Sequence, residues 1–314
     1  MNKVLVLGGS GFVGRHVCEQ LARLEIGITV PTRRESNARA VQILPGLDVI
    51  EADIRDETAL ARLLPGHDAV VNLVGVLHGT QARFQAAHVE LPRRLARAMQ
   101  QTGVRRLVHI SALGASADGP SRYQRSKAAG EAVLREAGLD LTLLRPSVIF
   151  GAEDNFLNLF ARLQARMPLM LLPGADARLQ PVWVGDVARA VLRCLQEPTS
   201  IGQTYELAGT RVCTLRELVQ LAGRLSGHPR PVIGLPLALG YPQALLLQCL
   251  PGEPLMSTDN LASLKIDNVA SGKLPGLAEL GITPAPLEPV VAAYLDLRDQ
   301  ADPLLALRRR NSRG

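Results

Sequence analysis

Aromatic residues and cysteines are scarce in this chain of 314 residues. Phe, Trp and Tyr together make up 3% of it, which argues against a nucleic-acid-binding protein that stacks bases on aromatic rings. The four cysteines form no CxxC pair, so we expect neither a structural metal site nor a disulfide scaffold. This cysteine usage is typical of a reducing compartment, and the first residues lack the pattern of a cleavable signal. Both observations predict a cytoplasmic protein.

Lysine is also rare. Four of the 35 basic residues are lysines, and the chain carries a net charge of +6. The excess of arginine is typical of a GC-rich genome, or of a surface that meets phosphates or anionic lipid. In either case a lysine that falls inside a motif is notable.

Short apolar runs alternate with amphipathic segments over the first half of the chain. This alternation predicts an α/β fold of the Rossmann type, in which helices cover both faces of a doubly wound parallel sheet. The expected strands are 3–7, 28–30, 47–50, 69–74, 106–110 and 141–145, and the expected helices are 12–24, 56–64, 81–102 and 122–137.

The pattern changes after Gly151, where a helix and a loop rich in Pro and Gly follow. We therefore expect a nucleotide-binding domain over residues 1–200, with 150–180 contributing to the substrate side. A smaller, partly interleaved C-terminal substrate domain is expected over 201–300, and a basic tail over 301–314.

A glycine cluster with the spacing GxxGxxG, formed by Gly8, Gly11 and Gly14, follows the first strand and begins the first helix. The first glycine permits a tight turn, the second lets the backbone approach a pyrophosphate, and the third lets the helix pack against the sheet. The helix N-terminus then supplies N–H donors to the phosphates. The cluster predicts a dinucleotide site.

Two arginines, Arg33 and Arg34, follow the second strand, where an NAD site usually places an acidic residue. Guanidinium groups suit the 2′-phosphate of NADP, so we expect NADP(H) to be preferred and NAD(H) to be accepted. The alternative is a pair of solvated charges, and Glu35 next to them weakens the prediction. Asp53, after the third strand, suits a contact with the adenine amino group, or else Asp53 or Asp56 caps a helix.

The sequence YQRSK places Tyr123 and Lys127 four residues apart on a predicted helix, and therefore on one face. An ammonium group beside a phenol would lower the pKa of the tyrosine, which could then act as an acid or base on a carbonyl or alcohol. The same lysine could hold the nicotinamide ribose. Ser111 ends the fifth strand, where its hydroxyl could polarise the substrate oxygen.

In these motifs the chain resembles the extended short-chain dehydrogenase/reductase superfamily. The motifs are LGGSGFVG (7–14), NLVG (72–75), Ser111, YQRSK (123–127), RPSVIFG (145–151) and WVGDVA (183–188). Further segments, FGAEDNFLN (150–158), QPVWVGDVARAV (180–191) and LPGLAELGITPAPLE (274–288), resemble the group that contains the nucleotide-binding accessory subunit of respiratory complex I. Members of this group are described as epimerase/dehydratase-like, and relatives are linked to ubiquinone biosynthesis.

The resemblance implies Ser111, Tyr123 and Lys127 as catalytic residues, and no metal. It also implies a set of cofactor contacts: Gly8, Ser10, Gly11, Phe12, Val13, Gly14, Arg33, Arg34, Asp53, Ile54, Leu73, Val74, Gly75, Lys127, Pro146 and Val148. Two positions depart from the family pattern. Ser111 and Tyr123 are only 12 residues apart, and His88 stands where the family often has Asn. His88 could relay protons, although a histidine on the helix surface is the expected reading.

Two functions remain open from the sequence. One is an oxidoreductase or epimerase/dehydratase that acts on a carbonyl or alcohol substrate of unknown identity, with a quinone or lipid as one option. The other is a non-catalytic NADPH-binding accessory or assembly protein of respiratory complex I or of quinone biosynthesis.

The segment from Pro231 to Gly252 carries no charge but contains four prolines, so a transmembrane helix is not expected. We expect a buried part of the substrate domain. The alternative is an apolar lip that touches the inner face of a membrane or a lipidic substrate, with Arg224, Arg230 and the basic tail at anionic headgroups.

Overall fold

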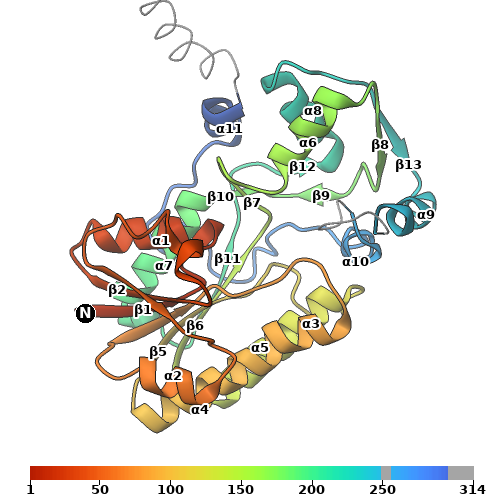
Figure 1. Ribbon diagram of the computed structural model, residues 1–314. Helices are drawn as coiled ribbons and strands as arrows, with labels where there is room; N and C mark the ends of the chain where they lie inside the picture. Colours follow the sequence, from red (N-terminus) through yellow and green to blue (C-terminus); the bar gives the residue numbers. More distant parts are fainter. Residues whose placement is uncertain (249–255, 296–314) are drawn as a thin grey trace, which may run out of the picture.

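The computed structural model of the protein describes residues 1–248 and 256–295, and Figure 1 shows its two lobes. The larger lobe is built on a sheet of seven strands in the order β11-β6-β5-β4-β1-β2-β3, and all neighbouring strands are parallel. The strands are β1 (Lys3–Leu7), β2 (Gly27–Thr32), β3 (Leu47–Glu51), β4 (Ala69–Asn72), β5 (Arg106–Ile110), β6 (Asp140–Pro146) and β11 (Thr204–Leu207).

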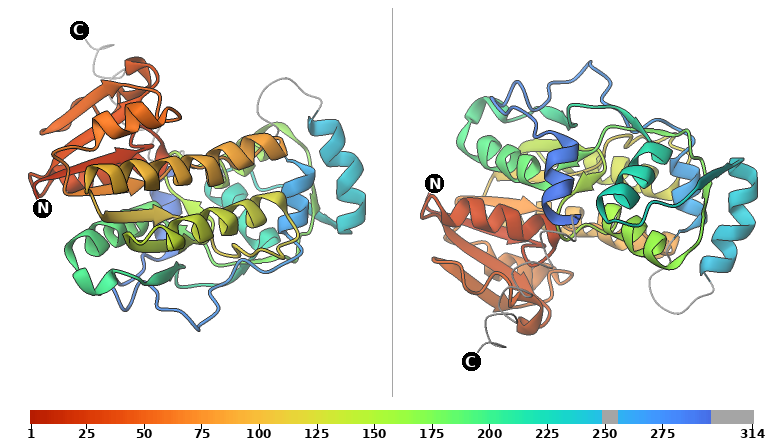
Figure 2. Two further views of the ribbon diagram at one scale, coloured as in Figure 1. Left: turned by 90° about the horizontal axis from the view of Figure 1, so that it is seen from below. Right: turned by 90° about the horizontal axis from the view of Figure 1, so that it is seen from above.

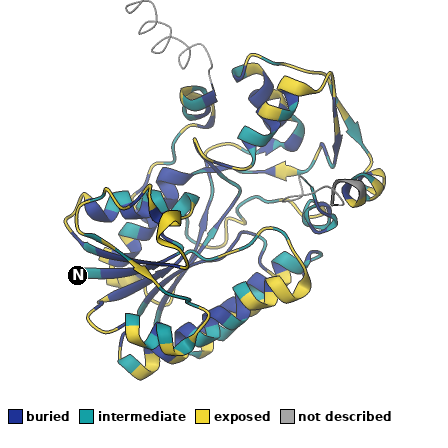
Figure 3. Cartoon of the chain, in the orientation of Figure 1, coloured by how far each residue is buried: buried dark blue, intermediate teal, exposed yellow. Residues whose placement is uncertain are grey.

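This strand order confirms the predicted Rossmann fold. The central strands are buried on both faces, as their uninterrupted apolar runs require, and they form the dark interior of Figure 3. The chain reverses direction across the sheet between β1 and β4, and such a switch point opens a crevice at the carboxyl ends of the strands.

Helices cover both faces of the sheet. The apolar core on one face lies under α1 and α7, and the core on the other face lies under α2, α4 and α5. Figure 2 shows α4 and α5 side by side on the second face. These helices are α1 (Phe12–Ala22), α2 (Glu57–Leu63), α4 (Leu91–Thr102), α5 (Arg122–Glu136) and α7 (Val184–Gln196), with short 3₁₀ turns η1 (Glu35–Ala38) and η3 (Pro198–Ser200).

The helix expected over 81–102 is interrupted. It consists of α3 (Gln81–Gln85), a π-helical turn η2 (Ala86–Glu90) and α4. A π turn rotates the register of the side chains that follow it, and such turns are frequent at functional sites. Here the turn places His88 in the interior of the protein.

The smaller lobe has its own apolar core, formed mainly by α6, α8, α11 and the strands near them. Three two-stranded sheets, β7–β10, β9–β12 and β8–β13, belong to this part of the chain. Its elements are β7 (Ile149–Phe150), α6 (Leu157–Arg166), β8 (Met170–Pro173), β9 (Arg178–Leu179), β10 (Val182–Trp183), β12 (Cys213–Thr214), α8 (Leu215–Leu225), β13 (Val232–Leu235), α9 (Leu237–Gln248), α10 (Thr258–Ser263) and α11 (Leu287–Leu295).

The uncharged segment that begins at Pro231 forms β13 and α9, and its last residues lie outside the described part of the chain. The expectation that it is buried is wrong. Leu239 and Leu245 of α9 are 58% and 56% exposed, and of this segment up to residue 245 only Gly240 and Ala244 are buried. Within residues 1–248 and 256–295, no helix combines the length and apolar character needed to cross a bilayer. The 301–314 tail is outside the described residues.

Candidate functional site

The loop between β1 and α1 has the geometry of a phosphate cradle. Gly8 adopts a φ of +83°, which a residue with a side chain rarely adopts. A Cβ on Gly14 would lie 2.2 Å from the carbonyl oxygen of Gly8, so only glycine allows the helix to start this close to the loop. Gly11 is the N-cap of α1, and no side chain caps the helix. The first-turn amides, from Phe12 and Val13 onward, are thus suited to bind an anion.

A second feature lies at the end of β2. Arg33, Arg34 and Asn37 line a cavity of about 380 Å³. Neither arginine forms an ion pair within the described part of the chain, and the carboxylate of Glu35 accepts a hydrogen bond from the side chain of Gln42 instead. The two guanidinium groups are therefore exposed and available to a phosphate.

The carboxylate of Asp53 is already engaged at this end of the sheet. Arg55 donates to it from Nε at 2.9 Å and from a terminal nitrogen at 2.7 Å, and these bonds lower the pKa of Asp53 to about 2. The helix-capping role falls to Asp56, whose side chain accepts from the backbone N–H of Thr58. Ile54 packs against the apolar core beneath α2.

The loop after β4 connects the phosphate cradle to the YxxxK helix. Gly8 lies against the backbone of Leu73 and Val74, within 3.4 Å of where its Cβ would be. At Gly75 a Cβ would lie 3.2 Å from Nζ of Lys127, so the absence of a side chain leaves that nitrogen accessible from the loop.

The structure brings Lys127 and Ser111 to the same strand end. Lys127 Nζ donates to the carbonyl oxygen of Ile110 at 3.1 Å, next to Ser111 at the end of β5. Lys127 is 5% exposed, and burial lowers its pKa to about 8. The Oγ of Ser111 is buried and has no hydrogen-bond partner in the described chain. A buried hydroxyl without a partner is unusual and suits a bound polar group.

The expectation that Lys127 lowers the pKa of Tyr123 is wrong for this structure. Burial raises the pKa of Tyr123 to about 12. The ammonium group donates to the Ile110 carbonyl, and within the described chain the phenol has no hydrogen bond to it. Tyr123 is therefore protonated at neutral pH, which is the form that a proton donor to a substrate oxygen requires.

His88 is not on the helix surface, as the sequence suggested, but 2% exposed. Its Nε2 accepts from the backbone N–H of Val76 at 3.0 Å, so its proton is on Nδ1, which donates to Ser126 Oγ at 2.8 Å. Ser126 in turn donates to the carbonyl of Tyr123 at 2.8 Å. Burial, with Lys127 nearby, lowers the pKa of His88 to about 3. His88 is a neutral structural group that joins the loop after β4 to α5, the helix that carries Tyr123.

Aromatic contacts complete the support of the phenol ring. The ring of Tyr123 meets His88 edge-to-face at 5.6 Å between centroids and meets Phe84 at 6.2 Å. A close backbone approach fixes the same region, because a Cβ on Gly130 would lie 1.9 Å from the carbonyl oxygen of His88.

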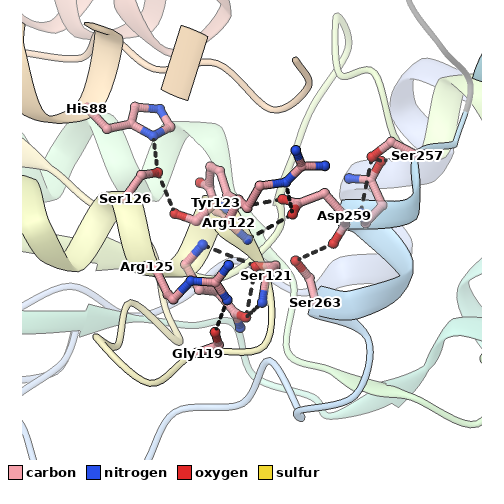
Figure 4. A network of polar contacts seen from close by, with 12 residues as sticks. His88, Gly119, Ser121, Arg122, Tyr123, Arg125, Ser126, Ser257, Asp259 and Ser263 are labelled. Carbon is pink, nitrogen blue, oxygen red and sulfur yellow. Dashed lines mark hydrogen bonds and ion pairs between the residues drawn. The ribbon is translucent and has the colours of Figure 1, made fainter. Parts of the chain in front are cut away.

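Two further residues act at this site and carry no recognisable motif. Asp259, at the start of α10, accepts hydrogen bonds from the backbone N–H groups of Arg122 and Tyr123 (Figure 4). Asn268 accepts from the backbone N–H of Val148 at 3.2 Å and donates to the carbonyl of Leu113 at 3.4 Å. The only local signal was the Ser257–Asn260 capping pattern of a short helix, which says nothing about a distant contact.

Pro146 ends β6 and Val148 follows it, on the far side of Ser111. The carbonyl of Pro146 accepts from the N–H of Leu113, and Val148 bonds to Val182 and Asn268. The expected cofactor residues therefore lie at the β1, β2, β3, β4 and β6 strand ends, and the Ser111–Lys127 pair lies between those of β4 and β6.

Comparison with known proteins agrees with this arrangement. The profile of the NAD dependent epimerase/dehydratase family matches residues 4–208. The chain belongs to this family. It is 33% identical to the mouse mitochondrial protein "NADH dehydrogenase [ubiquinone] 1 alpha subcomplex subunit 9" over 290 residues, which are 90% of this chain and 77% of the mouse protein.

Family members with other names are also similar. The ceramide reductase of Caulobacter vibrioides is 29% identical over 237 residues, which are 74% of this chain and 73% of the reductase. Among solved structures, that of gox2253 superposes with a TM-score of 0.74 and 24% identity, covering 95% of this chain and 99% of the other. This last likeness concerns the fold alone.

Proposed function

We propose that this protein is an NADP(H)-dependent oxidoreductase that reduces a carbonyl, or oxidises the corresponding alcohol, on a substrate with an apolar chain. The observation that carries the proposal is the buried pair formed by the unpartnered hydroxyl of Ser111 and the ammonium of Lys127, beside an uncapped glycine-rich helix N-terminus.

The residues fit a nicotinamide dinucleotide. The first-turn amides of α1 would hold the pyrophosphate, Arg33 and Arg34 the 2′-phosphate, and Lys127 the nicotinamide ribose. Among the described residues Lys127 forms no ion pair, and the carboxylate of nearby Glu131 is engaged by Arg145 at 2.6 and 2.8 Å. A buried cation of this kind suits ribose hydroxyls. The bound cofactor would supply or accept the hydride.

The chain's own residues would then handle the proton. Ser111 would donate a hydrogen bond to the substrate oxygen, and Tyr123 would deliver a proton to that oxygen when the carbonyl is reduced. Burial raises the pKa of Tyr123 to about 12, so the phenol is protonated at neutral pH and carries the proton that reduction of a carbonyl requires.

Ligand binding and turnover test this function separately. We expect NADPH to bind more tightly than NADH in a fluorescence titration. Tyr123→Phe should leave NADPH affinity within about twofold and remove oxidation of NADPH at 340 nm in a screen of quinones and long-chain ketones. Tyr241→Phe, which changes a tyrosine of α9 in the same way, is the control. Equal affinity for both cofactors would refute the NADP preference. An active Tyr123→Phe variant would show that a group other than Tyr123 delivers the proton.

The apolar character of the substrate is supported by an exposed face on the smaller lobe. Leu171 of β8 and Ile233 of β13 are direct strand neighbours and are 46% and 48% exposed, and α9 packs beside them with Leu239 and Leu245 outward. No Asp or Glu lies in residues 155–175 or 218–252, and the exposed Arg166 and Arg230 flank the strands. Asp176, beyond the end of β8, is paired with Arg216, and Lys265 lies over the ring of Tyr241 in α9. Aliphatic side chains bordered mainly by basic groups suit an anionic lipid surface.

Co-sedimentation with vesicles tests this face. We expect the protein to pellet with phosphatidylcholine–phosphatidylglycerol vesicles, and Leu171→Ser combined with Ile233→Ser to lower the bound fraction at least threefold. Ile43→Ser removes an 85% exposed isoleucine from the larger lobe and is the matched control. Protein that stays in the supernatant with anionic and neutral vesicles at low salt would refute membrane association.

A second candidate function is a non-catalytic NADPH-binding accessory protein of a respiratory complex. The similarity to the mouse complex I subunit over 90% of this chain favours it. NADPH binding without turnover in the screen, with Tyr123→Phe indistinguishable from wild type, would support this candidate over the enzyme.

A further inference from the structure

The N-terminus of the catalytic helix α5 is completed by a residue of the smaller lobe. Asp259 Oδ1 accepts from the N–H of Arg122 at 2.8 Å, and Oδ2 accepts from the N–H of Tyr123 at 3.0 Å. The side chain of Ser121 accepts from the N–H of Gln124, and the side chain of Gln124 accepts from the N–H of Ser121. All four amides that a helix leaves free at its N-terminus are therefore bonded, two of them by Asp259.

The carboxylate of Asp259 is well placed for this role. It is 7% exposed, and the N-terminal end of a helix attracts negative charge. The guanidinium group of Arg122 adds a weaker contact at 3.4 Å. Asp259 lies in the first turn of the short helix α10, whose own N-terminus is closed by a reciprocal pair between Ser257 and Asn260, so the carboxylate is presented from a capped turn (Figure 4).

The same segment contacts the other catalytic strand end. Asn268, nine residues further on, bonds to the carbonyl of Leu113, two residues beyond Ser111, and to the N–H of Val148. Residues 257–268 thus contact both sides of the site, the helix that carries Tyr123 and the loop that follows Ser111. We call this segment the strap.

We propose that the strap sets the position of Tyr123 relative to Ser111, and that Asp259 is a positioning residue for the reaction. Eleven residues lie between Ser111 and Tyr123, and this connection alone does not fix the two side chains relative to each other. The strap supplies the missing constraint from outside. The backbone of Tyr123 is held at its N–H by Asp259 and at its carbonyl by Ser126, and its ring lies between His88 and Phe84.

The strap also joins the site to the exposed apolar face. α10 packs against α5 on one side and against α9 on the other. A substrate or surface that engages α9 therefore contacts an element only one helix away from Tyr123. The inference rests on the proposed acid–base role of Tyr123, but the position of the phenol can be measured without turnover.

Fluorine NMR of protein labelled with 3-fluorotyrosine measures that position directly. The chain has four tyrosines, and Tyr123→Phe assigns one resonance to Tyr123. We expect Asp259→Ala to shift or broaden this resonance, and Asp259→Asn, which keeps one acceptor oxygen and the volume of the side chain, to have a smaller effect. Hydrogen exchange at the amides of Arg122 and Tyr123 should accelerate about tenfold or more in Asp259→Ala.

Asp267→Ala is the control within the strap, because the carboxylate of Asp267 pairs with Arg178 of the smaller lobe at 3.7 Å. It should leave the Tyr123 resonance in place. An unchanged Tyr123 resonance in both Asp259 variants would overturn the inference. So would equal changes in the resonances of Tyr205 and Tyr294 in both variants, since these indicate a general loss of structure.

Turnover provides an independent readout. With any substrate that the wild type reduces, Asp259→Asn should lower kcat about tenfold and leave the KM for NADPH within about twofold, because the cofactor residues do not contact Asp259. A KM effect without a kcat effect would overturn the positioning role. If the wild type shows no turnover, the proposed function fails. The NMR and exchange results still test whether the strap positions Tyr123.

Discussion

Replacement of Lys127 by methionine should make the protein more stable and less able to bind cofactor. Burial lowers the pKa of Lys127 from 10.5 to about 8, so the charged form is destabilised in the folded protein. At about 1.4 kcal/mol per pH unit, this corresponds to about 3 kcal/mol at pH values well below 8. Methionine has similar length and no charge to bury, so Lys127→Met should gain a large part of that free energy at pH 7.

The pH dependence follows from the direction of this shift. Between pH 8 and 10.5 the unfolded chain holds a proton on Lys127 that the folded protein has lost, so the free energy of unfolding of the wild type rises with pH. The advantage of Lys127→Met is therefore full below pH 8 and disappears as the pH approaches 10.5. Titrations of other groups occur in both proteins and cancel in the difference.

Urea unfolding followed by circular dichroism at pH 6.5 to 10.5 would measure this difference. Lys273→Met, which changes an exposed lysine, is the control and should keep the pH slope of the wild type. Curves for the wild type and Lys127→Met that run parallel across this range would refute the assignment of Lys127 as a buried cation.

Three further predictions concern neighbouring residues. Gly14→Ala should abolish NADPH binding in a fluorescence titration, because its Cβ would lie 2.2 Å from the carbonyl of Gly8, whereas Gly103→Ala, a substitution far from the loop, should leave the affinity unchanged. Arg33→Ala should weaken NADPH at least tenfold and NADH by less than twofold, and an equal loss for both would contradict a 2′-phosphate contact. Glu131→Ala should cost about 3–5 kcal/mol in urea unfolding, because it leaves the guanidinium of Arg145 half-buried without its partner, and a loss below about 1 kcal/mol would show that the pair is not structurally important.

The parts of the site that lie close together in the sequence could be predicted from it. The spacing of Gly8, Gly11 and Gly14 after an apolar strand predicts the phosphate cradle between β1 and α1. Each glycine is required by the backbone conformation or close packing of its own neighbours. A parallel sheet covered by helices follows from the alternation of strands and helices. These features depend on contacts within one strand–turn–helix unit.

The remaining features depend on contacts that no local pattern encodes. The burial of His88 results from a π turn, and the segment around it has the spacing of an ordinary helix. The i, i+4 spacing places Tyr123 and Lys127 on one face, but it does not show that the ammonium bonds to the Ile110 carbonyl. The bond from Tyr123 to Asp259 spans 136 residues, so neither residue predicts the other. The exposure of α9 depends on how the smaller lobe folds and not on the hydropathy of the segment.

The cap of α5 has a consequence for the order in which the chain is made. Synthesis proceeds from the N-terminus, so the nucleotide-binding strands β1 to β6 and the helix α5 leave the ribosome well before Asp259 does. Until then the amides of Arg122 and Tyr123 have only water as an acceptor. A nascent or truncated chain that ends near residue 208 would contain the glycine loop and YxxxK, yet two amides in the first turn of α5 would lack their protein acceptor. The glycine loop can thus be complete before the N-terminus of α5 is.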